Sequence, residues 1–290
     1  MIKRLISLTV TKTKIIPVMS NFYKYIVTTF LLYFVVGAFV ANASHGQELR
    51  KIENTAFHRG EKITYRVFYD SYLTGNVNAG IASLEIKPDN EVIAGRNTMN
   101  VVGIGRTRGA FNFFFRVVNR YETFLDEEAI VPLLFIRRIN EGGYRKSQDV
   151  VFNQFENIAI SNTATVPVIP NVQDIISAFY YLRTYNYDDA KVGDIFDVSF
   201  FLDDSVYVSR VVFDGRENVN TRIGTFRTLR FRPQVLTGDV FSQPYPMTLW
   251  ISDDKNKIPV MIQSGIVVGS IKMELTEFSG LKNPVSSRVR

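Results

Sequence analysis

Apolar and polar side chains alternate along most of this chain, and that period of two limits the fold more than any other feature. In residues 267–275, Val267, Ile271, Met273 and Leu275 alternate with polar residues. Successive side chains of a strand point to opposite faces, so this pattern predicts an antiparallel strand with one buried face. The same alternation predicts strands at 61–70, 77–87, 97–104, 111–125, 132–141, 144–153, 194–202, 205–214, 225–233, 246–252 and 258–264.

Short turns join these strands in sequence order. Glu141-Gly142-Gly143-Tyr144 is typical of a two-residue hairpin, because glycine tolerates the positive φ angles of such turns. The Asp203-Asp204 pair and the polar run 253–257 separate strands in the same way. Strand after strand joined by short turns indicates an all-β, mainly antiparallel fold. We expect a curved meander sheet or open barrel of about a dozen strands.

One segment breaks the period of two. In residues 172–184, Ile175, Ile176, Phe179 and Leu182 recur at helical spacing. Asn171 can cap the helix and Asp174 lies in its first turn, where a negative charge is favourable. The pattern therefore predicts a single inserted helix that packs on the sheet or across the mouth of a barrel.

The first 43 residues have the layout of a secretory signal peptide. An apolar run at 25–40 follows basic residues and ends in Ala-Asn-Ala at 41–43, which predicts cleavage between Ala43 and Ser44. The run has 16 residues, whereas a membrane-spanning helix needs about 20, so a membrane anchor is the weaker alternative. A start at Met19 would give a signal of ordinary length and would make the residues before it an over-extended gene start.

Cleavage would change the charge of the chain. The full sequence has 34 basic and 28 acidic residues, so removal of the five presequence cations leaves 29 basic residues and a net charge of +1. That balance disfavours nucleic-acid binding. The chain has no cysteine, so it has no disulfide and no lipidation site of the lipoprotein type. We expect a periplasmic or secreted protein that does not span the membrane after cleavage. The removed cations are Lys3, Arg4, Lys12, Lys14 and Lys24.

The expected domain organisation is simple. A lead-in at 44–56 follows the signal, a single β-rich domain covers 57–282, and a loose C-terminal tail covers 283–290. No internal repeat divides the mature chain, and its length is compatible with one large β domain.

The composition argues against several classes of enzyme. The two histidines are His45, beside the cleavage site, and His58, before the first predicted strand. A Ser-His-Asp or Cys-His catalytic arrangement and a zinc site are therefore not expected. No glycine-rich phosphate loop or dinucleotide fingerprint occurs, so we expect no cofactor, no metal and no catalytic residue. The acidic pairs at 188–189, 203–204 and 253–254 lie in predicted turns, where aspartate is favoured.

The stretch 103–121 is the best candidate for a ligand-binding region. It interleaves arginines with four phenylalanines, and further arginines follow on the next hairpin. Arginine suits bidentate contacts to anionic headgroups or sugar acids. Alternatively, one face is core and the arginines are solvated or paired with nearby acids. A cluster of tyrosines after the predicted helix could line the same site or belong to the core. The candidate ligand-binding residues are Arg106, Arg108, Arg116, Arg120, Tyr144, Arg145, Tyr180 and Tyr181.

Several segments together resemble an exported bacterial family known as domain of unknown function 3108, from Bacteroidota and other Gram-negative bacteria. They include GEKITY at 60–65, FNFFFRV at 111–117, EGGY at 141–144, DIISAFYY at 174–181 and WISDD at 250–254. The likeness extends over about residues 57–282. It implies a β-rich envelope domain and supplies no activity. A looser similarity, at the level of the fold, exists to half-barrel periplasmic lipoprotein carriers.

Three hypotheses about function remain open. The first is a non-enzymatic envelope protein that binds a hydrophobic or amphipathic ligand such as a lipid, acyl chain or glycolipid. The second is a structural or protein-interaction module in envelope assembly, with an envelope protein as partner and no small ligand. The third is a hydrolase that uses carboxylates alone, which would need two acids facing each other in a cleft. The first hypothesis accounts best for export, the aromatic content and the lack of a catalytic arrangement.

Overall fold

The computed structural model describes residues 48–71, 75–234, 246–265 and 270–289. The expected signal peptide, its cleavage site at Ala43 and Ser44, and the alternative start at Met19 lie outside the described residues. Residues 49–290 form one compact unit, which holds every described strand, both described helices and all five clusters of buried side chains. None of the described helices has the length and hydropathy that crossing a bilayer requires.

The unit is built on one sheet of 15 antiparallel strands that does not close into a barrel, as the sequence predicts. The chain forms a meander in which the last strand pairs with the first, giving the order β10-β11-β12-β13-β14-β15-β1-β2-β4-β5-β6-β7-β8-β9, with β3 on β4. The strands are β1 (Lys62–Ser71), β2 (Gly75–Ile86), β3 (Glu91–Ile93), β4 (Arg96–Thr107), β5 (Val118–Asp126), β6 (Pro132–Glu141), β7 (Tyr144–Asn153), β8 (Ile158–Ser161), β9 (Thr165–Pro167), β10 (Ile195–Leu202), β11 (Ser205–Thr221), β12 (Gly224–Pro233), β13 (Met247–Ser252), β14 (Pro259–Gly265) and β15 (Ser270–Ser279).

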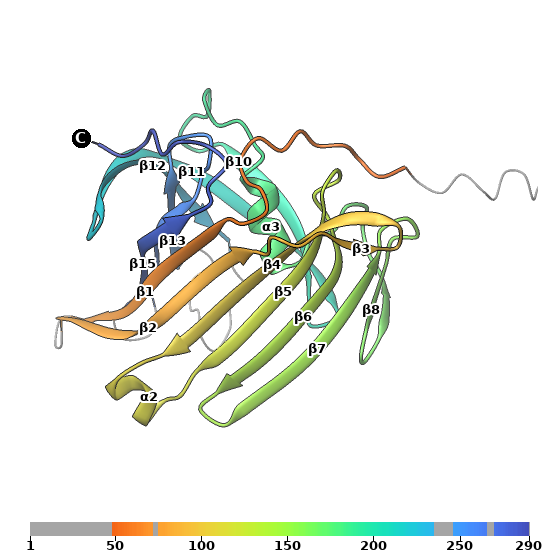
Figure 1. Cartoon of the computed structure of the whole chain (residues 1–290), viewed down its shortest axis with the longest axis horizontal. Coiled ribbons are helices and arrows are strands. Elements are labelled where there is room, and N and C mark those ends of the chain that lie inside the picture. The colour runs from red at the N-terminus through yellow and green to blue at the C-terminus, as the bar shows by residue number, and fades with distance from the viewer. Residues whose placement is uncertain (1–47, 72–74, 235–245, 266–269, 290) are drawn as a thin grey trace, which may run out of the picture. The chain divides into compact units, whose positions relative to one another are not determined.

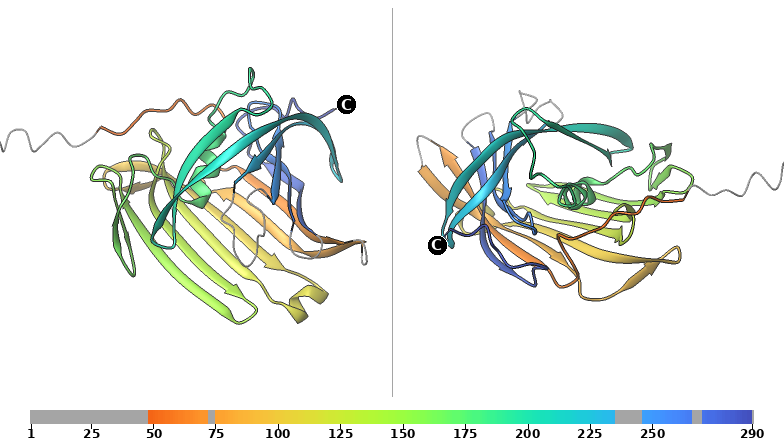
Figure 2. Two further views of the ribbon diagram at one scale, coloured as in Figure 1. Left: turned by 180° about the vertical axis from the view of Figure 1, so that it is seen from behind. Right: turned by 90° about the horizontal axis from the view of Figure 1, so that it is seen from above.

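The sheet curves around helix α3 (Ile175–Leu182). Figure 2 shows the helix end-on between two arms of the sheet, one with β10 to β12 and the other with β1 to β7. Tyr180 packs among Ile86, Met99 and Val101 of one arm, while Ala178 packs among residues of β10 to β13 in the other. The helix therefore fills the concave side of the sheet over part of the length of the strands.

A buried carboxylate fixes the start of α3. Asp174 is the N-cap, and its Oδ1 accepts hydrogen bonds from the backbone N–H groups of Ile176 at 2.7 Å and Ser177 at 2.9 Å. Thr123 of β5 donates to the other oxygen at 2.9 Å. The prediction that Asn171 caps the helix is therefore wrong. Asn171 instead adopts a positive φ of 59° in the turn before the helix.

Two further corrections concern local structure. The alternation in 111–125 predicts one continuous strand, but residues Ala110–Phe114 form the short helix α2 and only Val118–Asp126 pair as a strand. Alternation fails there because the chain turns between β4 and β5, and among the described residues 111–117 only Val117 forms a β-bridge, with Glu141. The structure also adds three short strands that the pattern did not predict, β3, β8 and β9.

The hairpin turns agree with prediction. Glu141 pairs with Tyr144, and both intervening glycines have positive φ, 52° at Gly142 and 100° at Gly143. Leu202 pairs with Ser205 across the aspartate pair at 203–204, whose φ angles are also positive. These are the angles of the primed two-residue turns that match the twist of a hairpin.

The two ends of the unit are tied to the sheet. At the start, Ala56 and Phe57 are completely buried in the core cluster around Tyr180. At the end, the Ser287 hydroxyl donates to Asp254 at 2.7 Å, and the Ser287 carbonyl accepts from the N–H of Arg227 on β12. The expectation of a loose tail is thus wrong for the described residues 283–289, which form part of the folded unit.

Candidate functional site

The strand register decides which predicted site residues face the inside of the curved sheet. A Cβ placed on Gly103 of β4 would lie 3.4 Å from Ile176 of α3, so Gly103 faces inward. Its partners across the ladder, Tyr121 on β5 and then Arg137 on β6, face inward too. Ile104, one residue on, faces outward with its partner Arg120.

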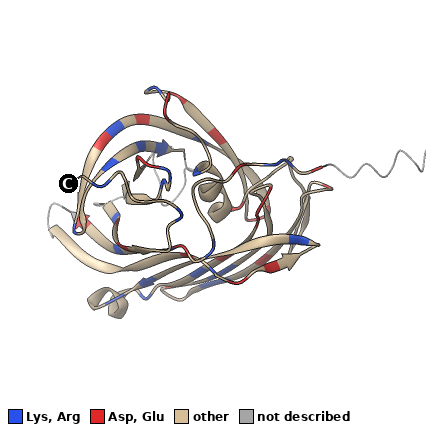
Figure 3. Cartoon of the chain, turned by 45° about the horizontal axis from the view of Figure 1, so that its top comes forward, with Lys and Arg blue, Asp and Glu red and all other residues tan. Residues whose placement is uncertain are grey.

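The predicted arginines accordingly lie on the outer face or at the end of the strands. Arg120 bonds to Glu122 on the outer face, at 3.1 and 2.7 Å. Arg106 lies on the outer face at the end of β4, and Arg108 and Arg116 flank α2. Arg145 begins the return strand of the β6–β7 hairpin. Figure 3 shows the distribution of charged residues over the strands.

Four of these arginines have free guanidinium groups. The side chains of Arg106, Arg108, Arg116 and Arg145 are exposed, and in the described part of the chain none of them has a hydrogen bond or ion pair. The neighbouring Tyr144 is also exposed. These five residues therefore lie around the ends of β4 and β6. Arg145, opposite Asn140, faces outward, whereas Tyr144, opposite Glu141, lies on the same face as Ile139 and Lys146.

The two predicted tyrosines lie on α3 and take no part in that group. Tyr180 is completely buried, and its ring meets Phe57 edge-on with centroids 4.9 Å apart. Tyr181 is half-buried, with the guanidinium of Arg50 4.1 Å from its ring centroid, and it accepts a hydrogen bond from Tyr185 at 3.0 Å. The eight predicted residues thus divide into three places and do not form one site.

Beyond α3, the same strands carry an inner surface that sequence reasoning missed. A Cβ on Gly103 would meet packed side chains, whereas a Cβ on Gly105, two residues further along the inner face, would meet open space. The core therefore ends between these two glycines. The inward-facing apolar side chains at and beyond this boundary are half-buried, and Ala82, Tyr121, Leu249 and Met273 among them also pack against the core clusters. We call this surface the inner apolar face, made by Ala82, Leu84, Tyr121, Ile139, Leu249, Ile262 and Met273.

A charged cluster borders the inner apolar face. Arg137 is only 5% exposed, donates to the Oε1 of Gln148 at 2.8 Å and pairs with Asp203 of the β10–β11 turn. Lys146 pairs with the same carboxylate. Burial opposes ionisation of Asp203, but hydrogen bonds from Lys146 and Arg137 hold its pKa below its usual range. The Arg137 Nε is buried and has no hydrogen-bond partner among the described residues.

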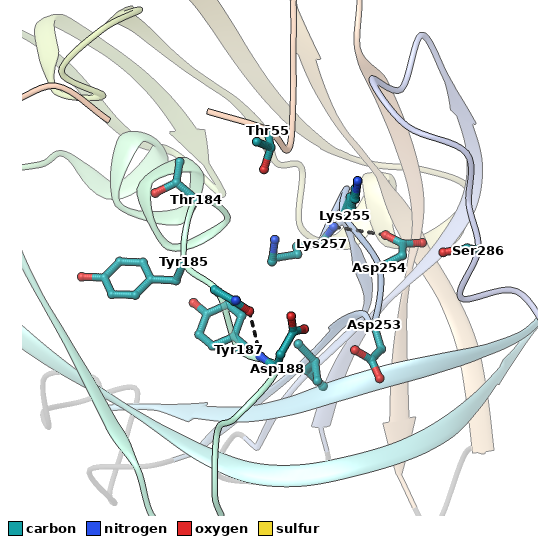
Figure 4. A pocket seen from close by; sticks show the side chains of 12 residues that line it. Thr55, Thr184, Tyr185, Tyr187, Asp188, Asp253, Asp254, Lys255, Lys257 and Ser286 are labelled. Carbon is teal, nitrogen blue, oxygen red and sulfur yellow. Dashed lines mark hydrogen bonds between the residues drawn. The ribbon is translucent and has the colours of Figure 1, made fainter. Parts of the chain in front are cut away.

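A separate polar pocket of about 410 Å³ lies past the C-terminal end of α3 (Figure 4). Lys255, Lys257 and Asp188 line it, together with Asp253 and the tyrosines that follow the helix. Burial, and then the nearby Arg183 charge, lower the pKa of Lys257. Asp254 bonds to Ser252 and Ser287, so it organises the β13–β14 turn. The pocket mixes both signs of charge and has little apolar surface for a lipid chain.

A second pocket, of about 460 Å³, contains His58. The Nε2 atom of His58 lies 2.8 Å from the carbonyl oxygen of Gly280. Arg59 and Glu127 pair with each other in the same pocket lining. These contacts join the turn before β1 to its neighbours and place no nucleophile beside the imidazole.

The family model described as "Protein of unknown function (DUF3108)" matches residues 64–276. No curated protein matches the chain.

Among solved structures, the chain is similar to a β-barrel-like protein of the domain of unknown function DUF1849 from Brucella abortus. The TM-score is 0.50 at 12% identity, over 80% of this chain and 98% of that chain. Lower scores relate it to a lipoprotein candidate from Parabacteroides distasonis, with a TM-score of 0.34 at 10% identity over 80% and 100% of the two chains. An exported-protein candidate with a YmcC-like fold from Bacteroides fragilis gives 0.33 at 11% identity, over 80% and 100%. The similarity to the Brucella abortus protein shows a shared fold.

Proposed function

Because the chain belongs to the family described as "Protein of unknown function (DUF3108)", we propose its function from geometry: it is an exported envelope protein that binds an amphipathic ligand on the inner apolar face. The ligand class is a lipid, acyl chain or glycolipid. The protein acts by binding rather than by catalysis.

The observation that carries this proposal is the change in side-chain packing along the inner face of β4. The inner face is packed at Gly103 and open at Gly105. On neighbouring strands, Leu84, Ile139 and Ile262 share that face and remain half-buried. Apolar surface left accessible on a concave face gains free energy when an apolar chain covers it, at about 25 cal/mol per Å² removed from water.

The charged border favours an amphipathic ligand over a purely apolar one. Arg137 has a buried Nε without a partner in the described structure, and Lys146 lies on the adjacent strand. The Lys146 side chain is partly exposed at this border, and its ammonium group can form a charge-assisted hydrogen bond with an anionic headgroup. Asp203 already pairs with both Arg137 and Lys146. The headgroup would therefore add a second anion beside these cations and would not replace Asp203.

The site of action follows from the N-terminal sequence. The signal-peptide pattern and the absence of cysteine support release into the periplasm or secretion without a lipid anchor. N-terminal sequencing of the protein from its native envelope is the direct test. Ser44 as the first residue supports export with cleavage, and Met1 or Met19 contradicts it.

Ligand binding can be tested with a fluorescent fatty acid and a protein spanning residues 44–290. Gly105→Phe places a ring in the open space on the inner face, where a Cβ has no neighbour within 4 Å. We expect at least tenfold weaker binding of the probe. Ile104→Phe is the matched control, because it adds a ring to the adjacent outer-face position of the same strand and is expected to leave binding unchanged.

Native mass spectrometry of protein purified from its own envelope provides the second arm. Co-purifying lipid that is lost in Gly105→Phe and kept in Ile104→Phe supports the proposal. If the unmodified protein carries no lipid and does not bind the probe, ligand binding is ruled out and a structural role in envelope assembly takes its place.

A further inference from the structure

The turn between β4 and β5 carries three phenylalanines that the fold leaves in solvent. Phe113 is 87% exposed, Phe114 82% and Phe115 52%. The rings of Phe113 and Phe114 meet edge-on, with centroids 5.4 Å apart. We call residues 106–116 the phenylalanine tip. Figure 1 shows it as α2 at the far end of β4, close to the β6–β7 turn.

The tip is held in a defined conformation by its base. Phe111 faces Tyr69 of β1 with ring centroids 6.5 Å apart. The Phe115 ring covers Gly142 so closely that a Cβ there would overlap it. Backbone N–H groups also donate across the base, from Gly142 to the carbonyl of Arg116 at 2.9 Å and from Phe115 to that of Phe111 at 2.8 Å. These contacts point Phe113 and Phe114 away from the protein.

The charged residues of the tip itself are all basic, and Glu141 of the adjoining turn accepts a hydrogen bond from Asn119. Residues 103–121 contain no aspartate or glutamate. Arg106, Arg108 and Arg116 are exposed and have no side-chain partner among the described residues, and Arg145 adds a fourth free cation on the adjoining turn. The two exposed phenylalanine rings have unpaired arginines before and after them in the sequence. This combination complements a surface that is apolar inside and anionic outside.

We propose that the phenylalanine tip docks the protein on an anionic lipid surface. Phe113 and Phe114 enter the boundary between headgroups and acyl chains, and the arginines contact lipid phosphates. Aromatic rings favour this boundary, and juxtamembrane cations are attracted by anionic lipid headgroups. The proposal is independent of ligand binding on the inner apolar face, because the tip lies outside that face.

The shape of the tip favours a bilayer over a protein partner. A stable protein interface buries about 800 Å² on each partner, with a well-packed core. Two rings on a narrow projection offer much less area than that. A bilayer, by contrast, surrounds a projection on all sides and needs no matching pocket.

Vesicle flotation tests the proposal with the protein spanning residues 44–290, which contains the whole folded unit and lacks the apolar run at 25–40. The probes are vesicles of phosphatidylcholine alone and of phosphatidylcholine with one quarter phosphatidylglycerol. We expect binding to the anionic vesicles that weakens as salt rises, because the Debye length is about 10 Å at 0.1 M and shortens further with added salt.

Two sets of variants separate the contribution of the phenylalanine rings to vesicle binding from that of the arginine charges. Phe113→Ser with Phe114→Ser should weaken binding at least tenfold, and Val92→Ser with Val192→Ser, also exposed, should not. Each cation beside an anionic surface contributes about 1 kcal/mol, or about fivefold in affinity. Replacement of Arg106, Arg108 and Arg116 by glutamine should therefore weaken binding about a hundredfold. The charge-matched control replaces Lys51, Lys191 and Arg222, which are exposed elsewhere, by glutamine.

The outcomes decide the proposal in both directions. Anionic-selective binding that both tip variants lose and both controls keep supports it. It is overturned if the unmodified protein stays unbound with both vesicle types, or if the tip variants bind as well as the controls. Self-association that only the tip variants abolish, without vesicle binding, overturns it in favour of a protein interface. Circular dichroism spectra equal to those of the unmodified protein establish that the variants fold.

Discussion

Arg183 and Glu61 form a bidentate ion pair inside the protein, with nitrogen–oxygen distances of 2.6 and 2.7 Å and side chains that are 1% and 0% exposed. The pair joins the C-terminal cap of α3 to the residue before β1. Arg183 also donates to the carbonyl of Asn256 at 3.0 Å and lies against the ring of Tyr180. One guanidinium thus connects the helix to the sheet and to the β13–β14 turn.

Loss of one partner of this pair should strongly destabilise the protein. Glu61→Gln leaves the buried guanidinium without its counter-charge, and we expect a loss of about 3–5 kcal/mol in the free energy of unfolding. Urea unfolding monitored by tryptophan fluorescence and circular dichroism measures it. Asp149→Asn, which breaks the exposed pair with Arg138, is the control and should cost less than about 1 kcal/mol. Equal effects of the two substitutions would contradict the structural role assigned to the pair.

The cap of α3 should give the protein a pH dependence of known sign. Burial raises the pKa of Asp174 from 3.8 to about 6, although its hydrogen bonds from Ser177, Thr123 and Ile176 oppose the shift. Between these two pH values the folded protein holds a proton that the unfolded chain has lost. Stability from this group is therefore complete below about pH 4 and is lost as pH rises through 6.

The measurement for Asp174 is a difference between variants, which cancels the other titrating groups. Asn can still cap the helix but does not ionise. The free energy of unfolding of Asp174→Asn relative to the unmodified protein should rise by up to about 3 kcal/mol between pH 4 and pH 7, because one pKa unit corresponds to 1.36 kcal/mol. A difference that does not change with pH would mean that Asp174 titrates normally.

In the β6–β7 turn, substitution of Gly142 should destabilise the protein more than substitution of Gly143. Gly142→Ala combines a positive φ with overlap of the Phe115 ring, whereas Gly143→Ala has a positive φ and open space around the new methyl group. We expect Gly143→Ala to cost about 1–2 kcal/mol and Gly142→Ala clearly more. Thermal unfolding of the two variants provides the comparison, and the reverse order would show that Phe115 moves aside freely.

The β10–β11 turn should open when its carboxylate is removed. Asp203→Ala leaves Arg137 and Lys146 without their shared partner, so hydrogen exchange in this turn should accelerate at least tenfold. Asp197→Ala is the matched change, since its partner Arg210 is exposed and 3.8 Å away. Unchanged exchange in Asp203→Ala would mean that the turn is held by its backbone alone.

The alternation of side chains was sufficient to predict the antiparallel meander, because it marks one apolar face on most strands and because described turns such as 142–143 and 203–204 have glycine or aspartate at positive φ. The same pattern says which residues share a face but not which face becomes the inside. Arg106 and Arg120 alternate with the inward-facing Gly105 and Tyr121, and the curvature of the sheet decides between the two sets. Curvature arises from the packing of the whole sheet on α3, so it leaves no local signal in the sequence.

The inner apolar face was missed for a related reason. Its residues come from strands far apart in the chain, and each is an ordinary apolar residue of an alternating strand. The local clue was Gly103-Ile104-Gly105, in which two inward positions carry no side chain. The free arginines of the phenylalanine tip were predicted as candidate ligand-binding residues, with solvation or pairing to nearby acids as the alternative. The tip itself was not predicted, because alternation in 111–117 suggested a strand where the chain forms α2.

The pairing of β15 with β1 has a consequence for the order of folding. Their ladder joins residues about 200 positions apart in the sequence, for example Arg66 with Glu274. The edge of β1 therefore stays unpaired until the end of the chain is available, and the centre of the sheet is completed last. Contacts of such long range slow folding, because a large loop must close before they form. A chain interrupted before residue 270 would expose a strand edge at the middle of its sheet, so early termination should yield aggregates rather than a smaller folded domain.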